Sequence, residues 1–394
     1  MKNTRWDKKI SAVVYCTTLM SVLGVSSVTP ALPKVALELN LEPLRVSLLV
    51  TAFALFACIF TPITGVLVDK LGRKKVLIPS LLLFGLSGCS CTFMPSFESM
   101  VVLRALQGVG AASLSFISIT ILSDLYSGRE LVKMTGYNAG FLSIGTAAYP
   151  VIGGAFAMLG WRYPFIISAL AFPVAIMAYF WLGYDEPKVS QSISEYLVHM
   201  FDNMKNSRLL SLVIINILNF IMFYGVYVTY YPFYLKKYFN ASVLSIGVIL
   251  SSTSVAAAIT SFKIKDLSRR LNETRLLMTA FFFYTITLFI IPHIPDLCTS
   301  TIPAILFGAA RGMCIAAVHT SLESLSSPKQ RGATLCMGGL GLRIGQFVGP
   351  LLMGAVFQLW GVKLIFYVGS FLSFAAFVFV FYLFGDGKSM KAAE

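Results

Sequence analysis

The chain has 394 residues, of which 57% are hydrophobic and only 12% are charged. A soluble domain would carry about twice that share of charged residues, and here the charges gather between long apolar runs, so the composition excludes a soluble globular protein. The formal net charge of +14 would suit a nucleic-acid partner, but the placement of the cations argues for a membrane instead.

Twelve apolar segments are each long enough to cross a bilayer as a helix. The alternation over about 10 residues that marks a membrane β-barrel does not occur. The sequence therefore predicts an all-α membrane protein with twelve transmembrane helices, at residues 10–32, 46–68, 76–94, 99–122, 134–158, 163–183, 209–234, 243–262, 276–294, 300–322, 332–357 and 364–384.

The basic residues predict how the chain is oriented. If both termini are cytoplasmic, 22 of the 31 Lys and Arg residues fall in cytoplasmic segments and six in external ones. Cytoplasmic loops of membrane proteins carry such an excess of cations. We therefore expect a multi-pass protein of the cell (plasma or inner) membrane with both termini inside, and no nucleic-acid partner.

An internal repeat predicts two halves. A shift of 200 residues without a gap superimposes Gly108 on Gly308, and the segment from Gly145 to Ala155 on the segment from Gly345 to Ala355. Such repeats are typical of secondary transporters, which bind substrate between the halves. We expect two pseudo-symmetric six-helix bundles, 1–183 and 209–394, joined by a cytoplasmic connector, 184–208, that carries a short amphipathic helix.

A basic hairpin follows the second apolar segment. The sequence GVLVDKLGRKK, from Gly65 to Lys75, holds one acid, Asp69, and four cations. Gly72 suits a turn with positive φ or close backbone approach. A carboxylate at the hydrocarbon edge is costly unless it has partners, so we expect Asp69 to interact with nearby arginines, Arg73 among them, or with a helix N-terminus.

The fourth segment carries a polar stripe. Arg104, Gln107, Ala111, Ser115 and Ser118 recur at spacings of three and four, which places them on one helix face. An arginine inside a membrane must face protein or water. Arg104 would therefore either take part in the transport mechanism or have a structural role, in which it bonds the backbone carbonyls of neighbouring helices.

The seventh segment predicts an aromatic and amide surface. Asn216, Asn219, Phe223 and Tyr227 share one helical face, which suits aromatic or amphipathic ligands, although ordinary aromatic packing is the alternative.

The tenth and eleventh segments add further ionisable groups. Arg311 and Arg343 lie near mid-depth, and His319 and Glu323 are four residues apart and can pair. Histidine changes charge near neutral pH, so His319 is a candidate proton carrier or ligand contact, with a structural pairing as the alternative.

Other features predict structure rather than chemistry. In the fifth segment Gly145, Pro150, Gly153 and Gly154 favour close helix packing and a bend. The seven cysteines mostly lie in apolar runs and form no CxxC pair, so we expect neither a metal site nor a cofactor. The tail sequence GKS lacks the upstream glycine of a phosphate-binding loop, and we expect no enzymatic activity.

Several of these motifs resemble those of the major facilitator superfamily over the whole chain. GVLVDKLGRKK is similar to its motif A, LRALQGVGAA (Leu103 to Ala112) to its fourth-span motif, and GTAAYPVIGG (Gly145 to Gly154) to the antiporter motif of its drug-efflux branch. Tyr149 stands where that motif usually has glycine. VTPALPKVALEL (Val28 to Leu39) also resembles the first span of those exporters.

The resemblance implies roles for individual residues. Asp69, with Gly65, Gly72 and Arg73, would form a cytoplasmic gate against the start of the eleventh span, near Gly332. The arginine matching Arg104 is implicated in proton coupling. Many exporters of this kind have an embedded acid in span 1 or span 4, which this chain lacks. Coupling would then depend on Arg104, His319 and Glu323.

The resemblance also implies a function. The expected activity is proton-coupled, multidrug-like efflux of small amphipathic substrates by a monomer that uses alternating access. Spans 1, 4, 7 and 10 would line the substrate cavity. The candidate substrate contacts are Gln107, Ser115, Asn216, Asn219, Phe223, Tyr227, Arg311 and Arg343. The alternatives are an importer, a uniporter or a lipid flippase on the same fold, or a membrane sensor that does not transport.

Overall fold

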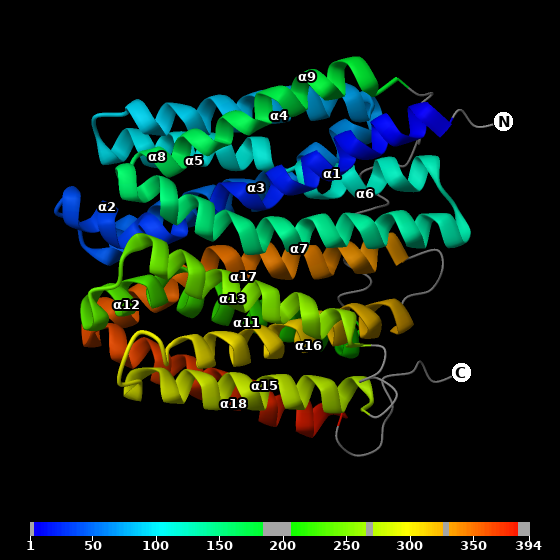
Figure 1. The fold of residues 1–394 in the computed structure, drawn as a ribbon. Coiled ribbons are helices and arrows are strands. Elements are labelled where there is room, and N and C mark those ends of the chain that lie inside the picture. The colour runs from blue at the N-terminus through cyan, green and yellow to red at the C-terminus, as the bar shows by residue number, and fades with distance from the viewer. Residues whose placement is uncertain (1–3, 184–205, 265–270, 326–330, 385–394) are drawn as a thin grey trace. The chain divides into compact units, whose positions relative to one another are not determined.

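The computed structural model describes residues 4–183, 206–264, 271–325 and 331–384, and the side chains of these residues except 4–7, 323–325 and 331–337. All regular structure in the described residues is helical, and no strand occurs among them. Twelve segments are long and apolar enough to cross a membrane. This confirms the predicted all-α fold with twelve transmembrane helices (Figure 1).

The chain divides into two compact units, each with six of these segments. The first comprises Met1–Leu41 and Leu48–Gln191, and the second Glu42–Ser47 and Ser192–Glu394. The helices that lie wholly or mostly in the first unit are α1 (Thr4–Ser26), η1 (Thr29–Ala31), α2 (Leu32–Glu38), α3 (Pro43–Leu71), α4 (Arg73–Ser90), η2 (Cys91–Phe93), α5 (Phe97–Ala111), α6 (Leu114–Leu125), α7 (Gly128–Leu159), α8 (Tyr163–Ile166), η3 (Ile167–Leu170) and α9 (Ala171–Trp181).

The second unit has the same order of long helices. They are α11 (Ser207–Phe220), the π-helix η4 (Ile221–Tyr230), α12 (Tyr231–Phe239), α13 (Val243–Phe262), α15 (Glu273–Ile290), η5 (Ile291–His293), α16 (Thr301–Leu325), α17 (Arg331–Trp360) and α18 (Val362–Phe384). The connector helix predicted within 184–208 falls largely on 184–205, outside the described residues.

Several segments extend further than predicted or are interrupted. The first continues through η1 and α2 to Glu38, because Pro30 and Pro33 lie at the starts of these two helices, where the missing N–H removes no helical hydrogen bond. The fourth is divided into α5 and α6 by a turn at Ala112 and Ser113. The seventh runs on to Phe239 and contains η4.

The 200-residue repeat reappears in the packing within each unit. A Cβ atom added to Gly108 of α5 would collide with the carbonyl oxygen of Phe53 on α3. One added to Gly308 of α16 would collide with that of Thr253 on α13. Gly308 and Thr253 lie 200 residues after Gly108 and Phe53, respectively. Each unit therefore contains an equivalent helix-packing contact within itself.

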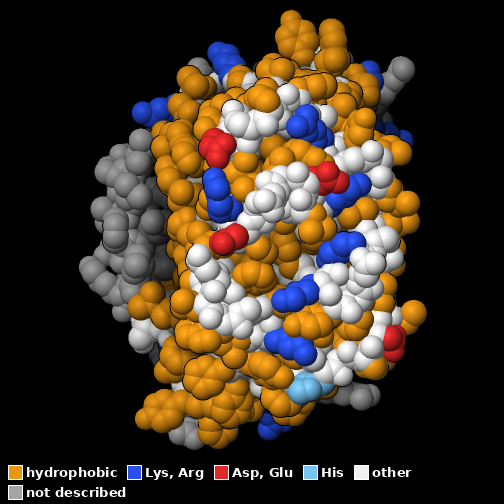
Figure 2. All heavy atoms as spheres, turned by 90° about the vertical axis from the view of Figure 1, so that its left-hand side faces the viewer, with side chains coloured by type: hydrophobic (Ala, Val, Ile, Leu, Met, Phe, Trp, Pro, Cys, Tyr) orange, Lys and Arg blue, Asp and Glu red, His pale blue; other side chains and the backbone are white. Residues whose placement is uncertain are grey.

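The helices expose large apolar side chains on their outer surfaces, as lipid contact requires. Phe180 of α9 is 68% exposed, and Phe371 and Tyr382 of α18 are 68% and 86% exposed. Figure 2 shows one end of the molecule, where hydrophobic side chains cover much of the surface and charged groups lie among polar ones. A water-soluble monomer rarely exposes so much contiguous apolar surface.

Candidate functional site

The predicted basic hairpin joins α3 to α4. Gly72 is the one residue between the two helices, and its φ of 96° lies in the region that favours glycine. Its N–H donates to the carbonyl of Val68 at 3.1 Å. The turn therefore places Asp69, on the last turn of α3, next to Arg73, the first residue of α4.

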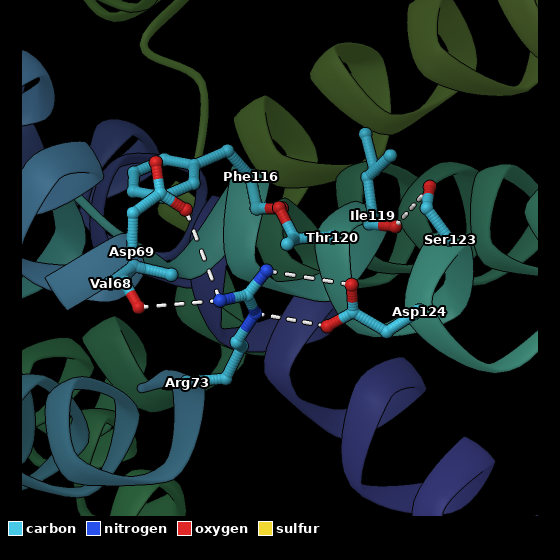
Figure 3. Close-up of polar contacts among 8 residues, drawn as sticks. All are labelled: Val68, Asp69, Arg73, Phe116, Ile119, Thr120, Ser123 and Asp124. Carbon is cyan, nitrogen blue, oxygen red and sulfur yellow. Dashed lines mark hydrogen bonds and ion pairs between the residues drawn. The ribbon is translucent and has the colours of Figure 1, made fainter. Parts of the chain in front are cut away.

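Arg73 is the buried centre of this hairpin (Figure 3). Its side chain is 3% exposed. Its Nε donates to Asp124 Oδ2 at 2.9 Å and its Nη2 to Asp124 Oδ1 at 3.4 Å, a bidentate pair. Its Nη1 also reaches the carbonyl of Val68 at 3.5 Å. The arginine thus ties the hairpin to α6, the helix that carries Asp124.

Asp69 is at the edge of the same cluster. Its Oδ1 lies 3.9 Å from Arg73 Nη1, and its side chain is 46% exposed, against 10% for that of Asp124. Arg73 is therefore neutralised mainly by Asp124, and the carboxylate of Asp69 keeps an open side. Gly65, one turn earlier in α3, would accept a Cβ without a contact within 4 Å, so nothing described approaches it closely.

The sequence reasoning missed Asp124. The predicted fourth segment ends at residue 122, where the apolar run ends, and this leaves Asp124 in the loop that follows. In the structure α6 continues to Leu125 and brings Asp124 against the hairpin. The signal available was an acid two residues beyond the predicted end of the fourth segment, in a chain whose hairpin at 65–75 carries four cations.

Arg104 is the centre of a second polar network, inside the first unit. It is fully buried, and its Nε donates to the carbonyl of Leu49 on α3 at 2.7 Å. Its Nη1 donates to Gln107 Oε1 at 2.5 Å, and the guanidinium lies 4.7 Å from the ring centroid of Phe53. Gln107 Nε2 donates in turn to Ser168 Oγ at 2.9 Å. Arg104 and Gln107 therefore fasten α5 to α3 and η3.

The predicted polar stripe does not continue along one face. Ser115 is exposed, whereas Ser118 is fully buried and donates to the carbonyls of Leu114 and Val14. The turn at Ala112 and Ser113 separates α5 from α6, so the helical spacing that places Arg104, Gln107 and Ala111 on one face does not carry across it to Ser115.

The amide and aromatic residues of the seventh segment contact different helices of the second unit. Asn216 Nδ2 donates to the carbonyl of Gly338 at 2.8 Å, and Asn219 Oδ1 accepts from Tyr284 at 2.8 Å. Tyr227 is 1% exposed, bonds Thr253 and stacks on Phe307 with ring centroids 4.6 Å apart. Tyr227 thus packs in the core of its own unit.

Phe223 and the two arginines form a separate group. The guanidinium of Arg311 on α16 lies 3.8 Å from the ring centroid of Phe223 on η4. Arg343 Nη1 on α17 donates to Gln346 Oε1 at 3.2 Å. Phe223, Arg311 and Arg343 are all partly exposed.

The remaining ionisable candidates lie at the end of α16. His319 is exposed. Glu323 belongs to the same helix, and its side chain lies outside the described residues. No group of three or more His, Cys, Asp or Glu residues able to hold a metal ion occurs within the described ranges.

The glycines of α7 allow close contact with the first segment. Gly145 lies against Leu19 and Val22 of α1, Gly154 is buried, and Pro150 lies inside α7 without ending it. A Cβ at Gly153 would collide with the carbonyl oxygen of Ser27. The backbones of α7 and of the turn after α1 therefore touch at Gly153.

Gly153→Ala is expected to destabilise the protein by about 1–3 kcal/mol, because the blocking atom is backbone and the two segments must separate. Gly140→Ala in the same helix is the matched control. It meets no atom within 4 Å and should be neutral or slightly stabilising, since alanine favours helix over glycine. Unfolding in mixed SDS micelles measures both, and equal stability of the two variants would contradict this packing.

Comparisons with known proteins place the chain among transporters. A family model described as Major Facilitator Superfamily matches residues 14–302 and 212–393. The Quinolone resistance protein NorA of Staphylococcus aureus (strain COL) is 24% identical over 352 residues, which cover 88% of this chain and 89% of that protein. Multidrug resistance protein 2 of Bacillus subtilis (strain 168) is 25% identical over 370 residues, 91% of each chain.

Solved structures agree on the fold. The crystal structure of the nucleoside transporter NupG superimposes with a TM-score of 0.81 at 14% identity, and the match covers 95% of this chain and 100% of that one. At this identity the likeness concerns the arrangement of helices alone.

Proposed function

This chain belongs to the Major Facilitator Superfamily and is a multi-pass membrane transporter, and we propose that it exports small amphipathic compounds from the cell in exchange for protons. NorA and Multidrug resistance protein 2 align over about nine tenths of both chains. Their names describe resistance to quinolones and to several drugs, which is the result expected when a transporter removes a drug from the cell.

The half-exposed carboxylate of Asp69 is the observation that carries the mechanism. Asp124 neutralises Arg73, so Asp69 is held at the hairpin but keeps an open side for another partner. A helix N-terminus is such a partner, and it stabilises a nearby anion by about 0.3–1 kcal/mol. Asp69 would bind the start of α17, near Gly332, when the cytoplasmic side closes, and would release it when that side opens. Gly65 and Gly72 would let the backbone of the α3–α4 hairpin approach the backbone at the start of α17.

Alternating access then follows from movement of two six-helix bundles, 1–183 and 209–394, about a substrate cavity lined by spans 1, 4, 7 and 10. Among the candidate contacts, Ser115, Phe223, Arg311 and Arg343 are at least partly exposed and suited to touch substrate. Gln107, Asn216, Asn219 and Tyr227 are buried in bonds to neighbouring helices and would shape the cavity wall.

Proton exchange requires a group that water reaches. His319 is exposed whereas Arg104 is sealed inside its unit, so His319, together with Glu323, suits this role better. The close packing at the glycines of α7, together with a bend at Pro150, would limit leakage. The cation excess of the predicted inner loops supports a cell-membrane protein with cytoplasmic termini, and we expect it to act as a monomer.

Flux in reconstituted vesicles tests the proposal. Protein in vesicles loaded with a quinolone is given a pH gradient of either sign, and quinolone movement is followed with and without a protonophore. Exchange predicts that quinolone moves opposite to the protons, whichever way the protein is inserted, and that the protonophore abolishes the movement.

Other outcomes identify the alternatives. Movement in the same direction as protons would identify an importer, and movement indifferent to the gradient a uniporter. Scrambling of labelled lipid instead of quinolone would identify a flippase, and binding without flux a sensor. Each of these results would contradict proton-driven export.

A further inference from the structure

Four partly exposed side chains of the second unit come from three different helices and form what we call the two-arginine cluster: Phe223, Tyr224, Arg311 and Arg343. Phe223 and Tyr224 belong to η4 and meet edge to face, with centroids 4.9 Å apart. The guanidinium of Arg311 covers the ring of Phe223 at 3.8 Å. Tyr224 is close enough to both arginines to interact with their charges.

The charge of Arg311 has no acid to balance it within the described part of its unit. Its charge interacts with the hydroxyls of Tyr224 and Tyr284, and its buried Nε has no hydrogen-bond partner among the described residues. The next acid along α16 is Glu323, about 18 Å further along the helix axis. Between residues 209 and 384 the acids are Asp266, Glu273, Asp296 and Glu323, and none lies in the middle of a span.

Close packing of η4 against α17 lies directly beside the cluster. A Cβ at Gly225 would lie 2.6 Å from the carbonyl oxygen of Gly349, so η4 and α17 pack with their backbones nearly in contact directly beside Phe223 and Tyr224. Gln346 accepts from Arg343 one turn before Gly349 and orients that guanidinium. π-Helical segments are rare and frequently mark functional sites, and here the segment presents two adjacent aromatic rings to two arginines.

We propose that the two-arginine cluster binds the anionic group of the substrate, a carboxylate attached to an aromatic body. A cation at membrane depth without an acid is costly, and a bound oxyanion removes that cost. Guanidinium groups bind carboxylates through two parallel hydrogen bonds, and the rings of Phe223 and Tyr224 offer faces on which an aromatic body stacks. This inference rests on the proposed function and names its substrate class; lipophilic cations would be repelled here.

Three probes that share one aromatic body test the charge preference. Pyrenebutyrate, pyrenebutanol and pyrenebutylamine are titrated into the full chain in nanodiscs, with empty nanodiscs as the blank. We expect the acid to bind on the order of tenfold or more tighter than the alcohol, since hydrogen bonds to charged groups contribute more than neutral ones, and the amine to bind least. This ranking needs no variant, so it stands even if substitutions impair folding.

Variants then locate the site. Arg311→Gln and Arg343→Gln should each weaken pyrenebutyrate binding about tenfold or more and leave pyrenebutanol within about twofold. Arg311→Lys should recover part of the affinity because it keeps the charge. Arg275→Gln is the matched control, since it removes an exposed arginine of α15 from the same unit and should change nothing.

Several results would overturn the proposal: equal binding of the three probes, tighter binding of the amine, or an effect of Arg275→Gln as large as that of Arg311→Gln. The failure of export is a separate outcome. If pyrenebutyrate binds as described but no compound moves in the direction opposite to the protons, the binding site is supported and the proposed export is not. If an amine is exported and pyrenebutyrate does not bind, export stands and the site does not.

Discussion

Asp124→Asn is expected to destabilise the protein by about 3–5 kcal/mol, which is the usual cost of removing one partner of a buried ion pair. Asp124 holds both Nε and Nη2 of Arg73, whose side chain is 3% exposed. Without the carboxylate the guanidinium stays buried and loses its bidentate partner, while the Val68 carbonyl at 3.5 Å and Asp69 at 3.9 Å are longer contacts. Unfolding in mixed SDS micelles measures the loss.

Asp69→Asn is the matched control for this prediction. It removes a carboxylate from the same arginine, but one that is 3.9 Å away and 46% exposed, and exposed pairs contribute about 0–1 kcal/mol. We expect it to fold and insert normally and to lower quinolone flux, because Asp69 closes the cytoplasmic side in the proposed mechanism. The double variant Arg73→Met with Asp124→Leu should lose less stability than Asp124→Asn, since an apolar pair can replace a buried ion pair.

These variants separate two roles within one hairpin. If Asp69→Asn unfolded as readily as Asp124→Asn, the assignment of Arg73 to Asp124 would be wrong. If Asp69→Asn transported at the unmodified rate, Asp69 would be a topology-setting charge rather than a gate. The hairpin would then be explained by membrane insertion alone.

The sequence was sufficient for the membrane segments because each is defined by length and hydropathy, which are properties of one stretch of chain. The turn at Gly72 was predictable for the same reason, since one glycine between two helices supplies the positive φ. The 200-residue repeat matched Gly108 with Gly308, and the structure gives these two glycines equivalent packing contacts.

Contacts that depend on partners far along the chain were harder to predict. Helical spacing put Tyr227 on a face with Asn216, but η4 departs from α-helical spacing and turns Tyr227 toward Thr253 and Phe307. The pairing of Arg73 with Asp124 joins residues 51 positions apart, and single-segment hydropathy contains no information about it. The stacking of Arg311 on Phe223 is of the same kind.

Arg104→Ala is expected to cost about 3–5 kcal/mol, as for other large side chains removed from a packed interior. The side chain fills a fully buried site, bonds the carbonyl of Leu49 and covers the ring of Phe53. Its loss also leaves Gln107 Oε1 without the partner it now has at 2.5 Å. Unfolding in mixed SDS micelles measures the loss, and Ser115→Ala, at an exposed position of α6, is the comparison that should stay within about 0.5 kcal/mol.

Arg104→Lys distinguishes a structural arginine from one that couples protons. Lysine keeps the charge but cannot reproduce the fork that joins Leu49 and Gln107, so stability should fall by a smaller amount, about 1–3 kcal/mol. If Arg104 only fastens α5 to α3, the flux per folded molecule and its dependence on pH should match those of the unmodified protein. A shifted pH profile at normal folded yield would instead assign Arg104 to coupling, whereas a shift produced by His319→Gln alone would assign coupling to α16. Complete burial favours the second result, because a proton carrier must exchange with water and Arg104 has no exposed surface.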